Sequence, residues 1–208
     1  RGSIGHGFRV PSYSELNGNL AFGVAPNPNL DPVESLGWDF GIEQSFHDGQ
    51  FKLGVTYFGN RVENAIINPT GAGFVNTSGA SETSGIEASA KANLLDDRLS
   101  IAVNYTWLDR ALVDIPDNTI GLRIHGKITD RIQTGITATY LDTRSYGGNN
   151  LDSYCLANLY ANYEITENID LHFRVENLFD KNYQYFNGFG SIYPGRGRGV
   201  FGGVTISW

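Results

Sequence analysis

Apolar residues recur at every second position through most of this chain, and this period limits its possible folds more than any other feature. In the closing segment, Gly202–Trp208, the residues between Val204, Ile206 and Trp208 are small or polar. Successive side chains of a β-strand point to opposite faces, so the apolar residues share one face. This pattern fits the edge strand of a soluble all-β domain. It also fits a strand of an outer-membrane barrel, which needs about 9–11 residues, apolar outside and polar inside.

The composition indicates a single β-rich domain. The 208 residues are 40% hydrophobic, and the 26 glycines, 11 tyrosines and 12 phenylalanines favour strands and tight turns. No apolar run approaches the roughly 20 residues that a spanning helix requires. A net charge of −7 argues against a nucleic-acid partner. Cys155 is the one cysteine, so neither a disulfide within the chain nor a thiolate metal cluster is expected.

Alternating segments follow one another in pairs joined by turn residues, which predicts a series of β-hairpins. The first clear pair is joined by a turn containing Asp48-Gly49, a common hairpin signal. In total the pattern predicts about ten strands, at 1–8, 36–43, 51–57, 86–93, 100–107, 120–127, 136–140, 155–163, 169–176 and 202–208.

The connections and the polar positions favour a transmembrane barrel over a soluble sandwich. Short turns near residues 48, 96, 130 and 167 alternate with longer loops near 9–33, 67–73, 109–118, 144–150 and 180–197. Outer-membrane barrels have short periplasmic turns and longer extracellular loops. Ionisable residues also recur in mid-strand, where a dry core would make unpaired charges costly and a wet lumen would not.

Four segments resemble TonB-dependent outer-membrane receptors. The most specific is Arg174–Tyr183 (RVENLFDKNY). The others are Gly7–Leu16 (GFRVPSYSEL), Asn27–Ser35 (NPNLDPVES) and Val75–Ala80 (VNTSGA), the last followed by Ser84–Glu87 (SGIE). Their order and spacing resemble the C-terminal region of that family over essentially the whole chain. In the Arg174–Tyr183 segment, Asn177 and Asp180 can satisfy backbone groups where a strand ends, which favours a structural role.

The resemblance implies an all-β, antiparallel transmembrane β-barrel. Residues 1–208 would be the C-terminal part of a barrel of about 22 strands, without the N-terminal plug domain. Because the chain lacks Met and begins with Arg1, we expect it to be a piece of a longer protein. The resemblance further implies a multi-pass protein of the Gram-negative outer membrane, in contact with lipid and lipopolysaccharide. The parent would bind a ferric siderophore, haem or cobalamin and import it with energy from the TonB complex, which acts through the plug. No enzymatic activity and no cofactor are expected.

Two groups of residues are predicted to act in this function. Ligand contact is predicted for loop residues Tyr13, Phe22, Tyr185, Phe186, Phe189, Tyr193, Arg196 and Arg198. The two arginines could instead meet lipopolysaccharide phosphates, and the aromatic residues could simply pack together to order their loop. Contact with the lumen or the plug is predicted for Asp39, Glu43, Glu87, Lys91, Arg123, Asp170, Arg174 and Glu176.

Other readings of the sequence remain open at this stage. A self-contained small outer-membrane barrel could be a passive pore or a surface hydrolase, and a soluble all-β module could bind a partner. The histidines His6, His47, His125 and His172 are scattered, whereas a metal site needs converging ligands. Asp96 and Asp97 are predicted to form a turn rather than a catalytic pair, because adjacent strand residues face opposite ways.

Overall fold

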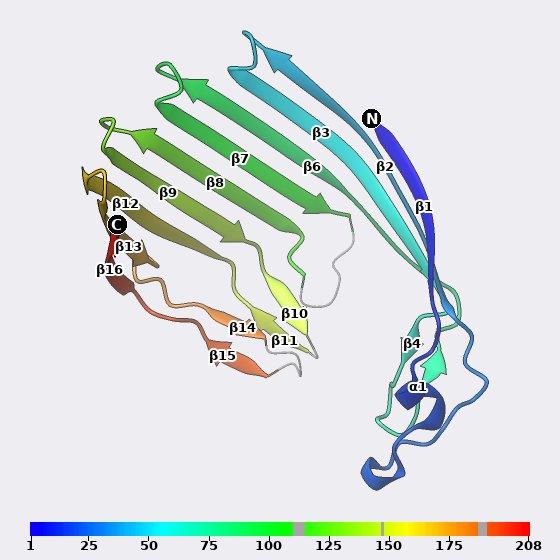
Figure 1. Cartoon of the computed structure of the whole chain (residues 1–208). Coiled ribbons are helices and arrows are strands. Elements are labelled where there is room, and N and C mark those ends of the chain that lie inside the picture. Colours follow the sequence, from blue (N-terminus) through cyan, green and yellow to red (C-terminus); the bar gives the residue numbers. More distant parts are fainter. Residues whose placement is uncertain (110–114, 147, 187–190) are drawn as a thin grey trace. The chain divides into compact units, whose positions relative to one another are not determined.

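Ten strands form one large antiparallel sheet in a computed structural model that describes residues 1–109, 115–146, 148–186 and 191–208 (Figure 1). The order in the sheet is β1-β2-β3-β6-β7-β8-β9-β12-β13-β16, so each strand lies beside its nearest long neighbour in sequence. The strands are β1 (Gly2–Arg9), β2 (Val33–Phe46), β3 (Phe51–Glu63), β6 (Ala80–Leu94), β7 (Leu99–Leu108), β8 (Asn118–Lys127), β9 (Ile132–Leu141), β12 (Tyr154–Thr166), β13 (Ile169–Glu176) and β16 (Gly199–Ile206). All ten predicted strands are confirmed, and β2, β3, β6, β9 and β12 are each at least four residues longer than predicted.

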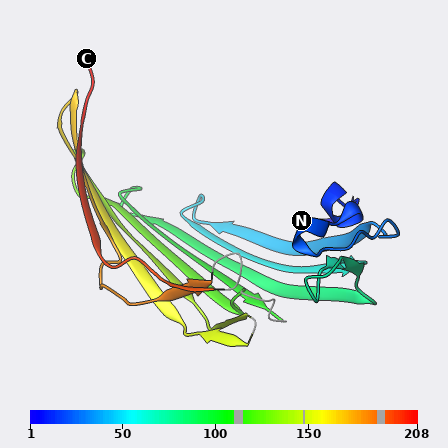
Figure 2. The same ribbon diagram turned by 90° about the horizontal axis from the view of Figure 1, so that it is seen from below.

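The chain divides into two compact units. Unit 1 comprises Arg1–Gly41 and Tyr57–Gly85, and unit 2 comprises Ile42–Thr56 and Ile86–Trp208. Strands β7 to β16 of unit 2 run side by side (Figures 1 and 2). No helix among the described residues is long and apolar enough to span a membrane.

Strand pairing in unit 2 separates apolar from polar side chains. One row of paired residues on neighbouring strands is Ile101, Ile124, Ile136, Leu159, Val175 and Val200. The adjacent row is Ser100, His125, Gly135, Tyr160, Arg174 and Phe201. Directly paired residues share a face and successive residues alternate, so the first row marks an apolar face and the second a polar face.

The sheet encloses almost no core. Only six apolar side chains are buried among the described residues: Leu30, Leu151, Tyr154, Ala157, Val175 and Phe186. In contrast, large side chains of the apolar face remain uncovered, with Ile42 66% and Val204 59% exposed. A soluble sandwich would bury such a face against a second sheet, and no second layer covers it in the described part of the chain.

Turns and loops alternate along the sheet as the sequence predicts. In unit 2 the short turns span 47–50, 95–98, 128–131 and 167–168. These turns lie at one end of the strands, which we call the turn edge. The longer connections lie at the opposite end of the strands, which we call the loop edge (Figure 1). Left-handed backbone at Asp48 (φ 53°), Gly49 (φ 89°), Asp96 (φ 53°) and Asp97 (φ 63°) closes the first two turns and confirms Asp96-Asp97 as a turn.

The long connections contain secondary structure that we did not predict. They hold helix α1 (Tyr13–Asn17), the 3₁₀-helix η1 (Leu20–Phe22) and three hairpins. The hairpins are β4 (Ile66–Ile67) with β5 (Val75–Asn76), β10 (Arg144–Tyr146) with β11 (Asn149–Leu151), and β14 (Gln184–Phe186) with β15 (Ile192–Pro194). Their strands are only two or three residues long, too short for a period to be visible.

A capping box fixes the start of α1. The Ser12 hydroxyl accepts a hydrogen bond from the Glu15 N–H, and the Glu15 carboxylate accepts one from the Ser12 N–H at 2.6 Å. The Arg9 guanidinium donates to both Glu15 oxygens, at 2.8 and 3.1 Å. The Arg9 hydrogen bond and then the Ser12 N–H lower the pKa of Glu15 to about 2.

In unit 1 the 10–32 and 64–79 connections are hydrogen-bonded to each other. The Asp31 N–H donates to the Asn76 side chain at 2.8 Å, and Asn76 Nδ2 donates back to the Asp31 carbonyl at 3.0 Å. Asn27 Nδ2 donates to the Phe74 carbonyl at 3.0 Å. Leu30, which lies between Asn27 and Asp31 in the sequence, has a buried side chain. Two segments that resemble receptor motifs, Asn27–Ser35 and Val75–Ala80, therefore hold each other in place.

Gly135 and Gly121 offer a matched test of packing on the polar face. A Cβ at Gly135 would lie 2.5 Å from the Tyr160 ring and 2.6 Å from the Ile124 carbonyl, whereas one at Gly121 would meet nothing within 4 Å. We expect Gly135→Ala to lower the free energy of unfolding by about 1–3 kcal/mol, because the ring and a backbone strand must both shift. Gly121→Ala should leave it unchanged or slightly raised. Urea titration of the full-length protein in lipid vesicles measures both, and equal effects would contradict this packing.

Acid should loosen the start of α1 over a defined range. Because the folded-state pKa of Glu15 lies below its ordinary value of 4.5, the ionised carboxylate stabilises this loop fully above pH 4.5. That contribution is lost as the pH falls toward about 2. Amide hydrogen exchange of residues 12–17 should therefore be faster in Glu15→Gln than in the natural protein at pH 7. The difference should vanish near pH 2, and Glu82→Gln should not change exchange in this segment.

Candidate functional site

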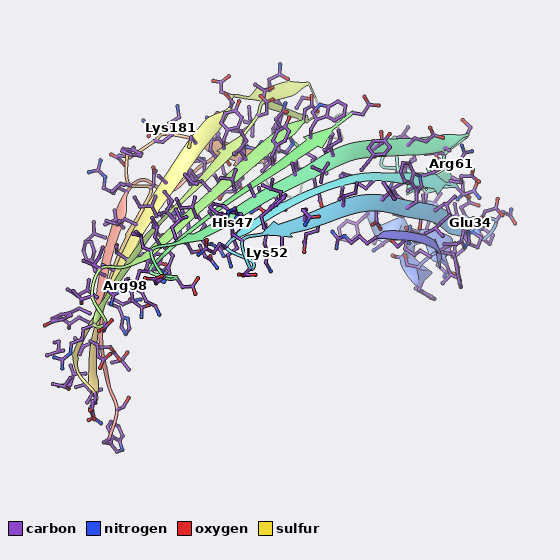
Figure 3. All side chains as sticks on the ribbon, turned by 90° about the horizontal axis from the view of Figure 1, so that it is seen from above. Glu34, His47, Lys52, Arg61, Arg98 and Lys181 are labelled. Atoms are coloured by element: carbon purple, nitrogen blue, oxygen red, sulfur yellow. The ribbon has the colours of Figure 1, made fainter. Side chains whose placement is uncertain are left out.

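Charged side chains of the long strands gather on the polar face. Side chains stand on both surfaces of the strands in Figure 3, and register assigns each residue to one of them. In unit 2, Arg123 pairs with Ala102 and Thr137, and Asp170 pairs with Glu164 and Thr205. Arg174 pairs with Tyr160, and Glu176 lies two residues further on the same face.

The remaining predicted lumen residues follow the same alternation on their own strands. The Ser100 hydroxyl donates to Asn93 Oδ1 at 3.0 Å, so Asn93 faces the polar side. Glu87 and Lys91 lie on that side of β6 because each is an even number of residues from Asn93. Asp39 and Glu43 share one face of β2, and Asp39 accepts a hydrogen bond from the Ser3 hydroxyl.

Hydrogen bonds connect neighbouring strands across the polar face. His125 Nδ1 lies 2.7 Å from the Tyr160 hydroxyl. His172 contacts Asn162 Oδ1 at 3.0 Å and Thr205 Oγ1 at 2.9 Å. Within the described residues, no three His, Cys, Asp or Glu side chains group closely enough to hold a metal ion.

A cavity of about 300 Å³ opens between β12, β13 and the connection that follows β13. Its charged lining comes from Arg174, Glu176 and Arg196, and its uncharged polar lining includes Asn158 and Tyr160. Arg174 Nη2 lies 3.3 Å from Glu176 Oε1, and its guanidinium stands 4.7 Å from the centre of the Phe201 ring. Arg174 is thus held in place while its charge stays half-exposed to solvent.

Asn177 holds the connection between β13 and β16. It is buried and left-handed (φ 49°), and its Nδ2 donates to the carbonyls of Lys181 (2.9 Å) and Arg196 (3.1 Å). Its Oδ1 accepts from the Lys181 N–H at 2.8 Å. Asp180 Oδ1 accepts from the Arg198 N–H at 2.8 Å. The expectation that Asn177 and Asp180 satisfy backbone groups at the strand end is confirmed.

The predicted ligand-contact residues are divided between the two units. Tyr13 and Phe22, in unit 1, are 83% and 82% exposed. In unit 2, Tyr185 and Tyr193 stack with ring centres 6.2 Å apart, and Phe186 is 7% exposed, so this hairpin packs partly on its own aromatic rings. Phe189 lies outside the described residues.

Arg196 and Arg198 are held mainly by their backbone. The Arg196 carbonyl accepts from Asn177, and the Arg198 N–H donates to Asp180. Both side chains are exposed, and Arg196 lines the cavity beside Arg174. That cavity was not predicted from the sequence, because its lining comes from β9, β12, β13 and a loop that strand register and the Asn177 contacts bring together.

Residues 1–178 match the family model described as "TonB dependent receptor-like, beta-barrel". The chain belongs to the TonB-dependent receptor family. The ten-stranded sheet is part of the barrel of such a receptor, which confirms the resemblance and the predicted fold class. A match of this extent covers every strand except β16 among the ten of the large sheet.

Curated relatives are receptors and transporters. The vitamin B12 transporter BtuB of Vibrio vulnificus is 29% identical over 98% of this chain and 34% of that protein. The ferric enterobactin receptor PirA of Pseudomonas aeruginosa is 26% identical over 88% of this chain and 29% of that protein. The chain therefore spans about a third of the length of these relatives.

Solved structures share the fold over the whole chain. The ferric enterobactin receptor PfeA of P. aeruginosa, solved with enterobactin, aligns with a TM-score of 0.79 and 22% identity. The alignment covers 100% of this chain and 38% of that one. The copper transporter OprC aligns with a TM-score of 0.80 and 19% identity over 36% of its chain.

Removal of the Asn177 side chain should release the β13–β16 connection. We expect Asn177→Ala to lose three hydrogen bonds to backbone groups, destabilise the loop by about 1–3 kcal/mol and speed amide exchange over residues 180–186 and 191–198. Asn177→Gly relieves the strain of the left-handed backbone but loses the same three hydrogen bonds, so exchange should rise similarly. Asn104→Ala, at an exposed position of β7, is the control. Exchange unchanged in both Asn177 variants would contradict the role assigned to this side chain.

Proposed function

We propose that this chain is the C-terminal wall and loop region of an outer-membrane receptor that imports a scarce large solute. The solute would be a ferric siderophore, haem or cobalamin, and the energy would come from the TonB complex acting through the N-terminal plug of the parent chain. Membership of the TonB-dependent receptor family supports this, as do relatives named for vitamin B12 and ferric enterobactin.

One observation carries the proposal: a sheet with an uncovered apolar face and a hydrogen-bonded, charged face. Exposed apolar area of this extent is costly in water, so a hydrocarbon environment is the natural partner of the first face. Aromatic side chains stand near both ends of these strands, with Tyr105 and Tyr140 toward the loops and Tyr163 toward the turns. Two such girdles are typical of a barrel in the outer membrane.

The polar face would then line the lumen and meet the plug. Arg174 keeps partners within the wall, Glu176 and Phe201, yet remains accessible. A wall of this kind can exchange hydrogen bonds with a polar plug and with water at little cost, because each group stays solvated when the plug shifts. A dry packed interface would not allow that exchange.

The loop edge would face outside and capture the solute. Exposed Tyr13 and Phe22 are presented by a loop fixed through its capping box and its contacts to the 64–79 connection. Tyr185, Tyr193, Arg196 and Arg198 lie in the connection that Asn177 fixes. Rigid loops lower the entropy lost on binding, which supports ligand contact for these residues. Phe186 would order its hairpin from a buried position.

Uptake measurements test the proposal. Cells that carry the full-length receptor should accumulate at least one of cyanocobalamin, haem or a ferric siderophore. Accumulation should stop when the TonB complex is deleted, while binding at the cell surface persists, because only passage depends on energy. Uptake that continues without TonB would instead favour a passive pore, and absence of both binding and uptake would overturn the receptor assignment.

Arg174 should matter to the plug more than to capture of the solute. Arg174→Met keeps a long apolar side chain beside Phe201 and removes the guanidinium that stands over its ring, so we expect faster amide exchange in the plug. Solute affinity should change less than about threefold, since Arg174 lies on the wall rather than in an exposed loop. Arg98→Met, at a turn-edge ion pair with Asp130 of 2.9 Å, is the control. Unchanged plug exchange with lost binding would contradict this role.

A further inference from the structure

A second cavity, of about 410 Å³, lies at the loop edge of unit 2, away from the polar-face cavity. Its described lining comes from residues 115 and 117, before β8, and from residues 143–145 and 150–152. Its lining residues are Ile115, Asp117, Thr143, Arg144, Ser145, Asn150, Leu151 and Asp152. None of them is among the ligand-contact residues predicted from the sequence.

Hydrogen bonds fix the base of this cavity. The Asp117 carbonyl accepts from the Leu108 N–H at 2.9 Å, which holds Asp117 against the end of β7. Asn118 Nδ2 donates to Asp142 Oδ2 at 2.8 Å, and the Thr143 N–H donates to Asp142 Oδ1 at 2.8 Å. Leu151, 1% exposed, is a fully buried side chain of the lining. The cavity is therefore built on a fixed support.

The described lining carries two carboxylates, Asp117 and Asp152, and one guanidinium, Arg144. Asp117 Oδ1 is buried and has no hydrogen-bond partner among the described residues. Asp152 adds a second, exposed carboxylate. Beside the cavity, the donors Asn118 and the Thr143 N–H lower the pKa of Asp142, so this group also stays negatively charged. Arg144 also lines the cavity, with its Nε buried, its Nη2 3.2 Å from the Gln184 carbonyl and its guanidinium centre 5.5 Å from that of the Tyr154 ring.

We propose that this cavity is a subsite of the transported solute, in which Asp117 accepts a hydrogen bond from an N–H or O–H group of a neutral or cationic solute. The inference rests on the proposed import function and narrows its solute class. A buried acceptor without a partner is costly, and a donor from the solute removes that cost on binding. Because two carboxylates accompany one guanidinium in the described lining, the net negative charge disfavours a polyanionic solute, such as a ferric complex of three catecholates.

The experiment is equilibrium binding to outer-membrane vesicles that contain the full-length receptor, with three probes. Cyanocobalamin is neutral and rich in primary amides, ferrioxamine B carries a free ammonium group, and ferric enterobactin is polyanionic. We expect one of the first two to bind, and Asp117→Ala to weaken it about tenfold or more, as expected for a lost hydrogen bond to a charged group.

Asp117→Asn separates the charge from the hydrogen bond. It keeps an acceptor oxygen, so a neutral probe should lose less affinity with this variant than with Asp117→Ala. An ammonium probe should lose a similar amount with both variants, because each removes the charge. Asp130→Ala, at the turn edge, is the control and should bind like the natural protein. The two Asp117 variants together keep the test valid if one of them folds poorly.

The outcomes distinguish this inference from the proposed function. If ferric enterobactin binds best, or if both Asp117 variants bind the preferred probe with unchanged affinity, the subsite is wrong while import stands. If no probe binds, the subsite is wrong, and the proposed function then depends on the uptake measurement, which also includes haem. Weaker binding in Asp117→Ala alongside an unchanged Asp130→Ala supports the subsite.

Discussion

The backbone hydrogen-bond ladder that joins ten strands is the constraint on which the rest of this structure depends. A strand in hydrocarbon has no water to satisfy its N–H and C=O groups, so each strand needs a neighbour on both sides. Long, regular pairing meets that need for the sheet strands from β7 to β13 with almost no enclosed core, whereas β16 ends the described sheet beside β13. The backbone pairing does not restrict the side chains, so one face can be apolar and the other polar. Because successive residues of a strand point to opposite faces, this difference appears in the sequence as a period of two.

This constraint explains which features were predictable from sequence. All ten long strands, the Asp48-Gly49 and Asp96-Asp97 turns and the polar orientation of residues such as Arg174 follow from local alternation. Helix α1 could also have been predicted, because Ser12 and Glu15 have the spacing of a capping box. The hairpins β4–β5, β10–β11 and β14–β15 could not, since two or three residues contain no measurable period.

The two cavities could not be predicted from the sequence, for a different reason. Asp117 and Asp152 are distant in the chain, and an acidic loop residue looks the same whether its carboxylate is solvated or buried without a donor. Likewise Arg174 and Arg196 meet only because the β13–β16 connection folds back, held by Asn177. Sites of this kind depend on how the loops fold back on the sheet, and the alternation of apolar and polar residues in the strands does not predict loop conformation.

The motif segments in this chain belong mainly to the support of the loops. Asn27, Asn76 and Asn177 each donate from their side-chain amides to backbone carbonyls in other parts of the long connections. A side-chain amide carries both donors and an acceptor, so it can satisfy backbone groups that have no strand partner without adding charge. Loops fixed in this way can vary at exposed positions, such as Tyr13, or at cavity positions, such as Asp117, without losing their fold. The resemblance between receptors with different solutes is then expected to be strongest at the amides that fix the loops and weakest at the side chains that meet the solute.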